Sequence, residues 1–369
     1  MGQPLKVLYL RTENSSGTLS LFAEGHKRRG SIARFVTLFP TAEGFPEDIC
    51  LDLPFTPKSE AFRKTKKAIL DESDLYQNAE GYPPVWKPSP GREIFFRMRD
   101  QLWRPAINRA VEKHGLHDFD IYHLEGGHGF FRTMPWPFDE LKKEGKYIIA
   151  NYHGVDMRTR GVFPWIDSLV DINTTSELDL LEKHPNIEYL YLPYDVKQHQ
   201  TRKYLNDPIR ICHATRDRYW KGSDVIIEAC RKLEKSHGVE FVLIENQPHE
   251  KTLQTKSGCD IYIDQVANLG GWGYGMNSVE ALSMGLCCCT NLLPQYESFL
   301  GDHPFINVQR DSLYNDLKAL VENPELIQRK QNDGRFWVEQ THDIDAVMSS
   351  VYAIYQRQGW IEETPHVAH

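Results

Sequence analysis

Residues 259–290 read CDIYIDQVANLGGWGYGMNSVEALSMGLCCCT. The apolar, β-branched run at positions 261–263 has the length of a buried strand. A loop with glycine at four of its six positions, residues 270–275, follows this run. Glycine has no Cβ atom and lets the backbone turn sharply or approach a ligand closely. The stretch therefore predicts a buried strand that ends in a tight loop.

A helix is expected directly after this loop. Asn277 or Ser278 can serve as its N-cap, and Gly285 should end it. Residues 286–289 then predict the next buried strand. The apolar positions that recur at near-helical spacing are Val279, Leu282 and Met284. Strand, glycine loop and helix together are typical of an α/β protein with a parallel sheet.

This arrangement is suited to binding phosphate. Glycines let the backbone approach the anion, and the unpaired amides and dipole at a helix N-terminus favour a dianion. Glu280 lies one turn into the helix, where its carboxylate can accept hydrogen bonds from sugar hydroxyls. A glycine-rich turn without a ligand is the alternative interpretation.

Asp260, the glycines and the Glu280–Ala281 and Met284–Gly285 pairs resemble the nucleotide-sugar signature of family-4 glycosyltransferases. The resemblance implies an α/β protein of GT-B fold: two Rossmann-like domains facing a cleft, with the C-terminal helix crossing back to the first domain. It also implies that Glu280 binds the ribose of the donor. Trp272 stands where the family has a glutamate that contacts the transferred sugar, so Trp272 is kept as a candidate sugar contact. The implied donor-binding residues of the loop and helix are Gly273, Tyr274, Gly275, Met276, Asn277 and Glu280.

Arg216 and Lys221 resemble the diphosphate clamp of the same family. They follow a predicted strand at residues 209–214, and Arg218 is an additional candidate. A leaving nucleoside diphosphate develops negative charge, which fixed cations stabilise without a metal ion. A solvated basic loop is the alternative.

The N-terminal half opens with a predicted strand at 6–10, a helix at 18–27 and a strand at 33–38, like the first unit of a Rossmann-like domain. Gly17, in the loop after the first strand, is a candidate acceptor or sugar contact. Residues 41–101 look like an irregular insertion. Arginines and aromatic residues interleave from position 92 on a predicted amphipathic helix, which suits an anionic acceptor, a membrane surface or simple packing on the domain.

Two further predicted strands, near residues 119–123 and 147–150, end in loops that contain glycine and histidine. Ligands of α/β folds bind at the carboxyl ends of strands. His153, which resembles a family-4 histidine that faces the donor sugar, is predicted to be catalytic together with Glu280. Gly127, His128 and Asp156 are candidate acceptor or sugar contacts. Asp156 can alternatively cap a helix or orient His153, and a purely structural role remains open for both histidines.

Length and composition fit a two-domain globular protein. The chain has 369 residues, 40% of them hydrophobic, and a net charge of −8, which argues against general nucleic-acid binding. No run of 18 apolar residues and no leader peptide is recognised. Seven cysteines without zinc-like spacing, three of them consecutive at 287–289, suggest buried thiols in a reducing cytoplasm.

The expected domains are residues 1–200 on the acceptor side, 201–345 for the nucleotide sugar, and a C-terminal helix and tail, 346–369, that packs on the first domain. The predicted function is metal-independent transfer of a sugar from a UDP-, GDP- or dTDP-linked donor to an unknown acceptor, with retention implied by the family. No cofactor is expected, and contact with the cytoplasmic membrane face is a secondary hypothesis. The alternatives are a non-catalytic nucleotide-binding or partner protein and a nucleotide-sugar epimerase.

Overall fold

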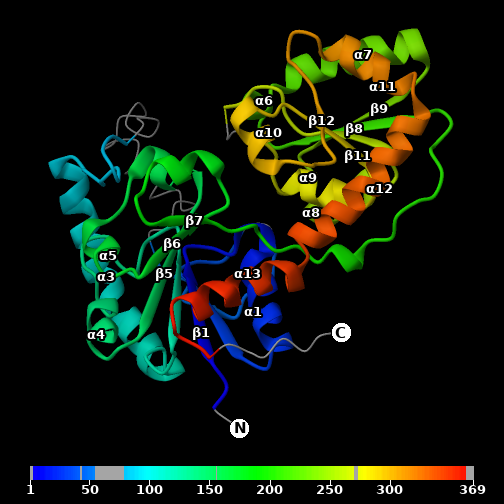
Figure 1. The fold of residues 1–369 in the computed structure, drawn as a ribbon. Helices are drawn as coiled ribbons and strands as arrows, with labels where there is room; N and C mark the ends of the chain where they lie inside the picture. Colours follow the sequence, from blue (N-terminus) through cyan, green and yellow to red (C-terminus); the bar gives the residue numbers. More distant parts are fainter. Residues whose placement is uncertain (1–2, 42–43, 55–78, 155, 270–272, 363–369) are drawn as a thin grey trace. The chain divides into compact units, whose positions relative to one another are not determined.

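A computed structural model describes residues 3–41, 44–54, 79–154, 156–269 and 273–362 (Figure 1). The chain divides into two compact units. Unit 1 comprises Met1–Tyr191 and Met348–His369, and unit 2 comprises Leu192–Val347. Each unit has its own parallel sheet and its own hydrophobic core.

Unit 1 contains a seven-stranded parallel sheet in the order β3-β2-β1-β4-β5-β6-β7. The strand order turns outward in both directions from β1 and β4, as in a doubly wound fold. The strands are β1 Lys6–Arg11, β2 Ile32–Thr37, β3 Ile49–Cys50, β4 Ile121–Glu125, β5 Tyr147–Tyr152, β6 Ile172–Thr175 and β7 Ile187–Tyr189. The helices are η1 Ser15–Gly17, α1 Thr18–Arg28, α3 Pro90–His114, α4 Phe138–Lys143, η3 Asp156–Arg160, α5 Pro164–Asp167 and η4 Leu178–Glu182.

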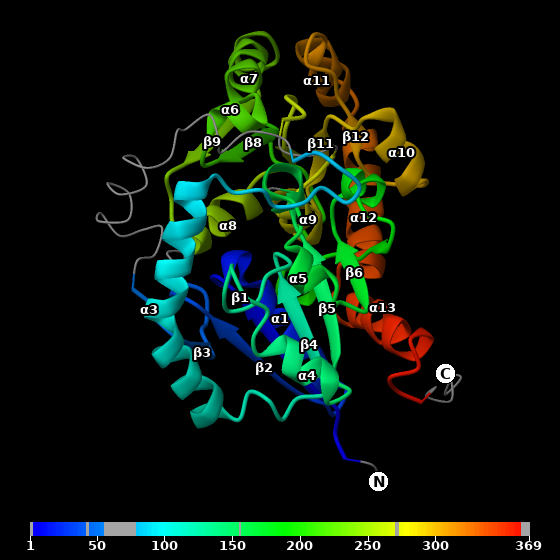
Figure 2. The same cartoon turned by 90° about the vertical axis from the view of Figure 1, so that its left-hand side faces the viewer.

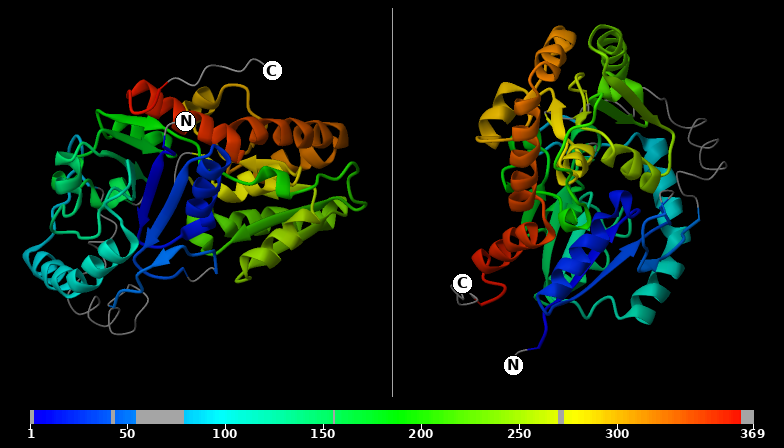
Figure 3. Two further views of the ribbon diagram at one scale, coloured as in Figure 1. Left: turned by 90° about the horizontal axis from the view of Figure 1, so that it is seen from below. Right: turned by 90° about the vertical axis from the view of Figure 1, so that its right-hand side faces the viewer.

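Alternate side chains of the unit 1 strands pack on opposite faces of the sheet, as the two-residue period of a strand requires. Leu8 and Leu124 join the core that includes Trp103 and Ile107 of α3. On the other face, Tyr9 stacks on His123 and Phe22, with ring centroids 4.3 and 5.2 Å apart. Figure 2 shows α3 in cyan beside the strands, and the right panel of Figure 3 shows α1 in blue against them.

Strand β3 and the start of helix α3 lie within residues 41–101, the range of the predicted irregular insertion. The short strand β3 pairs with β2, and α3 already begins at Pro90, where proline suits the first turn of a helix. The helix ends at His114 because Gly115 takes up a left-handed conformation, φ 59°. The prediction of a helix reaching about Lys113 is confirmed.

Unit 2 contains a five-stranded parallel sheet in the order β12-β11-β10-β8-β9. Figure 1 shows α7 and α11 on one face of this sheet and α8 and α9 on the other. The strands are β8 Arg210–Thr215, β9 Glu240–Glu245, β10 Ile261–Ile263, β11 Cys287–Thr290 and β12 Ile306–Asn307. The helices are η5 Val196–Gln198, α6 Arg218–Lys221, α7 Ser223–His237, α8 His249–Ser257, α9 Met276–Ser283, α10 Pro294–Leu300, α11 Leu313–Val321 and α12 Pro324–Thr341.

The fold-determining stretch forms the predicted elements, with one correction. Strand β10 occupies Ile261–Ile263, and the consecutive cysteines 287–289 are buried, unpaired members of β11. Gly285 ends the helix region with φ 75°. However, α9 begins at Met276 with Gly275 as N-cap, so the prediction that Asn277 or Ser278 caps it is wrong. Asp264, which directly follows β10, contacts this helix start by accepting from the Gly275 amide and the Ser278 hydroxyl.

The last helix, α13 Ile344–Arg357, starts in unit 2, and its residues from Met348 onward belong to unit 1. Within unit 1 this helix contributes one buried and one partly buried hydrogen bond to the layer that contains α1. The Tyr355 hydroxyl lies 2.6 Å from His123 Nε2, and the Tyr352 hydroxyl lies 3.1 Å from His26 Nδ1. The C-terminal helix therefore enters the first unit, as the predicted fold requires.

Candidate functional site

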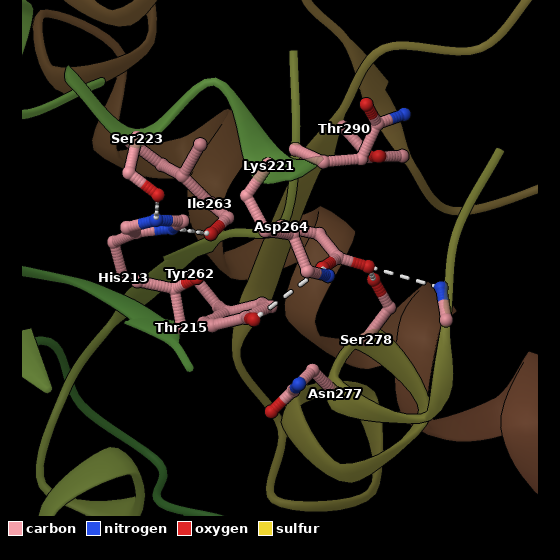
Figure 4. Close-up of polar contacts among 12 residues, drawn as sticks. His213, Thr215, Lys221, Ser223, Tyr262, Ile263, Asp264, Asn277, Ser278 and Thr290 are labelled. Carbon is pink, nitrogen blue, oxygen red and sulfur yellow. Dashed lines mark hydrogen bonds and ion pairs between the residues drawn. The ribbon is translucent and has the colours of Figure 1, made fainter. Parts of the chain in front are cut away.

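Asp264 lies at the centre of the polar site in unit 2, immediately after β10. Its carboxylate is fully buried and accepts hydrogen bonds from the Gly275 amide, at 3.0 Å, and from the Ser278 hydroxyl, at 2.5 Å. The same carboxylate forms an ion pair with the Lys221 ammonium group (Figure 4). Asp264 thus holds the start of α9 and the end of α6 against the carboxyl end of the sheet.

The Asp264 carboxylate is kept ionised by these contacts. Burial alone would raise its pKa, but the Lys221 charge and the hydrogen bonds from Lys221, Ser278 and Gly275 hold the pKa below its usual value. A negative group at a helix N-terminus is also favoured by the helix dipole. The start of α9 is therefore an environment built for an anionic oxygen.

Two backbone amides of the first turn of α9, those of Met276 and Asn277, have no hydrogen-bond partner in the described part of the chain. Such amides are the donors that a phosphate uses at a helix N-terminus. Gly273 makes the preceding loop tight, because a Cβ atom there would lie 1.7 Å from Tyr296 Cε1. Larger residues at this position are excluded by the tyrosine ring.

Two residues of α8 contact the Glu280 carboxylate and fix its position. Lys256, which is fully buried, places its ammonium nitrogen 2.5 Å from one carboxylate oxygen of Glu280, and His249 Nε2 lies 2.8 Å from the other. Lys256 also donates to Asn277 Oδ1 at 2.9 Å and lies over the Tyr262 ring. Burial would raise the pKa of Glu280, but Lys256 and His249 lower it to about 2. Glu280 is therefore an ionised carboxylate of fixed orientation.

The other predicted donor-binding residues of unit 2 lie at different depths. Lys221 is 24% exposed and reaches Asp264, whereas Arg216 is exposed in the loop after β8. The Tyr274 side chain packs on Phe305 and contacts His342 Nε2 through its hydroxyl, at 2.9 Å. Gly273, Gly275, Met276 and Asn277 line the start of α9, and Trp272 lies outside the described residues.

Two polar residues near the predicted clamp have structural roles. Arg218, the additional cation candidate, forms a bidentate ion pair with Glu245, at 2.7 Å for both hydrogen bonds. His213 donates through Nδ1 to the Ile263 carbonyl and accepts through Nε2 from Ser223, both at 2.8 Å (Figure 4). Burial lowers the pKa of His213 to about 4, so this histidine is a neutral link between β8, β10 and α7.

In unit 1 the predicted His153 is oriented by Glu125. The Glu125 carboxylate, at the carboxyl end of β4, lies 3.1 Å from His153 Nε2 and accepts from Asn151 Nδ2 at 2.9 Å. Burial would raise the pKa of Glu125, but these hydrogen bonds and the charges around it hold the pKa below its usual value. Because Nε2 donates to a carboxylate, the Nδ1 lone pair of neutral His153 remains an acceptor. Only 20% of the His153 side chain is exposed.

The remaining candidates of unit 1 are positioned by the same loops. Asp156 accepts from the His153 backbone amide at 3.3 Å, so it fixes the loop and not the imidazole ring. Gly127 has φ 62°, and a Cβ atom there would lie 2.0 Å from Tyr152 Cε1. His128 is buried beside it, and Gly17, with φ 67°, packs against Phe45.

Sequence reasoning missed four polar residues of these sites. Asp264 and Glu125 each stand at the carboxyl end of a buried strand, which is a signal that could have found them. Lys256 and His249 belong to the short segment between β9 and β10, and no local pattern marks them. Their contact with Glu280 arises only when α8 packs on α9.

Among the described residues, no three histidine, cysteine, aspartate or glutamate side chains gather as a metal-binding group. None of the helices in the described ranges combines the length and the hydropathy needed to cross a bilayer.

The chain matches no protein-family model and no curated protein sequence. Solved structures nevertheless share its fold over nearly the whole chain. A Listeria monocytogenes protein named as a candidate UDP-N-acetylglucosamine 2-epimerase is 12% identical, with 98% of each chain covered and a TM-score of 0.57. HepE of Anabaena, solved with UDP, is 11% identical over 96% of this chain and 100% of its own, with a TM-score of 0.57. An alpha-glucosyltransferase solved with UDP and a 13-mer DNA is 10% identical over 95% and 99%, with a TM-score of 0.56.

At these identities the likeness establishes the fold. Two Rossmann-like units with parallel sheets, and a last helix that enters unit 1, define the GT-B fold. The fold class expected from the sequence is confirmed. Fold alone does not assign an activity, which has to be argued from the sites.

Proposed function

We propose that this chain is a GT-B glycosyltransferase similar to family 4, which transfers a sugar from a nucleoside-diphosphate donor. The observation that carries the proposal is the pairing of Lys221 with an anionic oxygen at the N-terminus of α9. In the donor complex, a phosphate oxygen of the donor would take the position beside Lys221 and the amides of Met276 and Asn277. Arg216, at the edge of the same loop, would pair with the second phosphate.

Departure of the nucleoside diphosphate places negative charge on the phosphate oxygens. Lys221 and the α9 amides would stabilise that charge without a metal ion, because their positions are fixed before the reaction. Glu280, ionised and held by Lys256, would accept hydrogen bonds from the ribose hydroxyls. His153, with its Nδ1 lone pair directed away from Glu125, would accept a hydrogen bond from a hydroxyl of the sugar or of the acceptor.

Three finer features belong to the proposal. Retention of the anomeric configuration is implied by the resemblance to family 4. A UDP-linked donor is favoured over GDP- and dTDP-linked donors because HepE and the alpha-glucosyltransferase of similar fold were solved with UDP. A cytoplasmic site of action is supported by the seven unpaired cysteines, since reduced thiols persist in that compartment.

A nucleotide titration tests the proposal. UDP, GDP and dTDP are added to the purified protein, and the midpoint of thermal unfolding is followed. UDP should raise the midpoint, and Lys221→Met should weaken UDP binding by roughly 10- to 100-fold, because it removes a charge-assisted contact of about 1.5–3 kcal/mol.

Lys235→Met is the matched control, because Lys235 is exposed on α7 and makes no contact with the site. This variant should bind UDP like the unmodified chain. If no nucleoside diphosphate shifts the midpoint, the glycosyltransferase proposal is abandoned.

An epimerase acting on free nucleotide sugars is the second candidate. The Listeria structure and the Glu125–His153 pair, which could exchange a proton with a sugar ring, support this candidate. Incubation of UDP-sugars without any acceptor separates the two functions, because only an epimerase converts the donor into an isomeric donor. Binding of nucleotide without transfer or isomerisation would instead favour a non-catalytic partner protein.

A further inference from the structure

Four arginines of unit 1 lie close enough together that three of them repel the fourth, Arg132. Arg92 and Arg99 come from α3, Arg132 from the loop after β4, and Arg160 from η3. The guanidinium carbon of Arg132 lies 4.6 Å from the centre of the Phe96 ring. The guanidinium carbon of Arg99 lies 4.7 Å from the centre of the Phe96 ring and 4.0 Å from the centre of the Trp103 ring. The Phe96 ring thus supports the guanidinium groups of Arg99 and Arg132, and such a contact leaves the N–H groups of Arg132 available for a ligand. Arg160 instead donates to the Gly126 and Gly161 carbonyls.

Two carboxylates lie beside these arginines: Asp156 pairs with Arg160 at 3.6 Å, and Asp100 is already fully used. One of its oxygens accepts from Arg99, at 2.7 and 3.2 Å. The other accepts from the backbone amides of Arg132 and Thr133, both at 2.9 Å, and from the Thr133 hydroxyl at 2.8 Å. Asp100 therefore has no free position for the Arg132 guanidinium group.

Within the described ranges, two of the four arginines have guanidinium nitrogens without a hydrogen-bonding partner. Arg92 Nε is buried without one, and no hydrogen bond or ion pair joins the Arg132 guanidinium to the described residues. Burial lowers the pKa of Arg132, and repulsion from Arg99, Arg160 and Arg92 lowers it further. Both residues retain some exposed area, so solutes can reach them.

His128 adds a neutral acceptor beside this cluster. Its Nδ1 donates to the Gly129 carbonyl at 2.9 Å, so Nε2 carries the lone pair. Burial and the charge of Arg160 lower the pKa of His128 to about 4, so the ring is neutral at neutral pH. A ligand with an anionic oxygen next to a hydroxyl could bind the arginines through the oxygen and donate to His128 Nε2 through the hydroxyl.

We infer that Arg92 and Arg132 form a site for an oxyanion, a phosphate or carboxylate, carried by the acceptor. That the ligand belongs to the acceptor rests on the proposed function, whereas the anion site itself is argued only from residues of unit 1. Planar guanidinium groups match the geometry of phosphate and carboxylate oxygens. Buried cations without counter-charges cost stability unless a ligand supplies the charge.

The test is calorimetric titration of inorganic phosphate into the full chain carrying Lys221→Met, which weakens the proposed donor site. Saturable phosphate binding is expected, and Arg132→Leu should weaken it at least tenfold. Arg92→Met serves as a second variant in case Arg132→Leu does not fold. Arg97→Met is the control, because Arg97 on the same helix is 69% exposed and pairs with Glu93 at 2.6 Å.

A second readout separates binding from a structural role. Without added anion, Arg132→Leu should unfold at the same or a higher temperature than the parent, since it removes an unpaired charge. Unchanged phosphate affinity in both Arg132→Leu and Arg92→Met would overturn the inference, as would a lower unfolding temperature of Arg132→Leu. Parallel titrations with acetate and with a sugar phosphate show whether carboxylate or phosphate is preferred. Because UDP is absent, failure here is distinct from failure of the donor proposal.

Discussion

The two units treat buried charge in opposite ways. In unit 2 the functional carboxylates are matched by lysines: Glu280 by Lys256, and Asp264 by Lys221. In unit 1 the arginines around Phe96 outnumber their carboxylates, and Arg132 has no ionic partner in the part of the chain described. A charge with a partner fixes the position of its side chain, whereas a charge without one is stabilised only when a ligand supplies the opposite charge.

This difference separates preorganisation from recognition. The ion pairs of unit 2 fix Glu280 and the start of α9 before any ligand binds, so binding does not have to order them. The surplus charge of unit 1 does the reverse: it lowers the stability of the unliganded state and raises the affinity for an anion. Substitutions in the two regions should therefore have opposite signs.

Lys256→Met should have the largest effect and gives the strictest test of that contrast. Lys256 is fully buried and only 9% of the Glu280 side chain is exposed, so the substitution leaves a buried carboxylate with His249 alone. The free energy of unfolding should fall by roughly 3–5 kcal/mol, measured by urea denaturation.

The double variant Lys256→Met/Glu280→Met should recover much of that loss, because it removes both charges together. Lys251→Met is the control, since Lys251 is exposed on the same helix. If the single and double variants are equally unstable, Lys256 acts through packing and not through its charge. The contrast between the units would then fail.

Acid should affect unit 1 through His128, next to the arginine cluster. The pKa of His128 is about 4 in the folded chain and near 6.5 when unfolded, so the unfolded state binds more protons between these values. Stability contributed by neutral His128 should be complete above about pH 6.5 and be lost as the pH falls to 4, by up to about 3 kcal/mol.

His128→Gln should flatten this part of the stability profile, measured by urea denaturation at pH 4.5, 5.5 and 7. His117→Gln is the control, because His117 is exposed at the end of α3. Phosphate at pH 5 should restore stability to the chain with His128, since an anion offsets the added positive charge. An unchanged slope in His128→Gln would contradict the assignment.

Sequence alone could predict the backbone elements of unit 2, because the signals for strand, loop and helix lie next to one another in the chain. Strand β10, the glycine loop, α9 and β11 follow one another within about thirty residues, and Lys221 follows β8 at a recognisable spacing. The starting point of α9 was not predictable from local capping rules, because Asp264, eleven residues before Gly275, supplies the carboxylate.

Unit 1 was less predictable for a physical reason. Its polar contacts join segments far apart in the chain: Glu125 with His153, and Asp100 with Arg132. The arginines of α3 were visible as a basic helix, but whether each has a counter-charge depends on the loop after β4. Charge pairing across long sequence separations leaves no periodic pattern.

Asp264→Asn should have the smallest effect of these substitutions. It removes the counter-charge of Lys221, so that this lysine, like Arg132 of unit 1, has no ionic partner in the part of the chain described. An asparagine oxygen can still accept from the Gly275 amide and the Ser278 hydroxyl, but it no longer neutralises Lys221. UDP should therefore bind about tenfold more tightly, a change of about 1.4 kcal/mol, because the diphosphate no longer competes with a carboxylate for the ammonium group.

Ser278→Ala is the matched control for that measurement, since it removes a hydrogen bond to the same carboxylate and leaves its charge in place. Its UDP affinity, measured by calorimetry, should stay within about twofold of the parent, although its stability should fall by about 1 kcal/mol. Weaker UDP binding by Asp264→Asn would mean that the carboxylate positions Lys221 for the ligand and does not compete with it. The ion pair would then be part of the binding geometry, and the two units would differ in stability but not in how their cations are used.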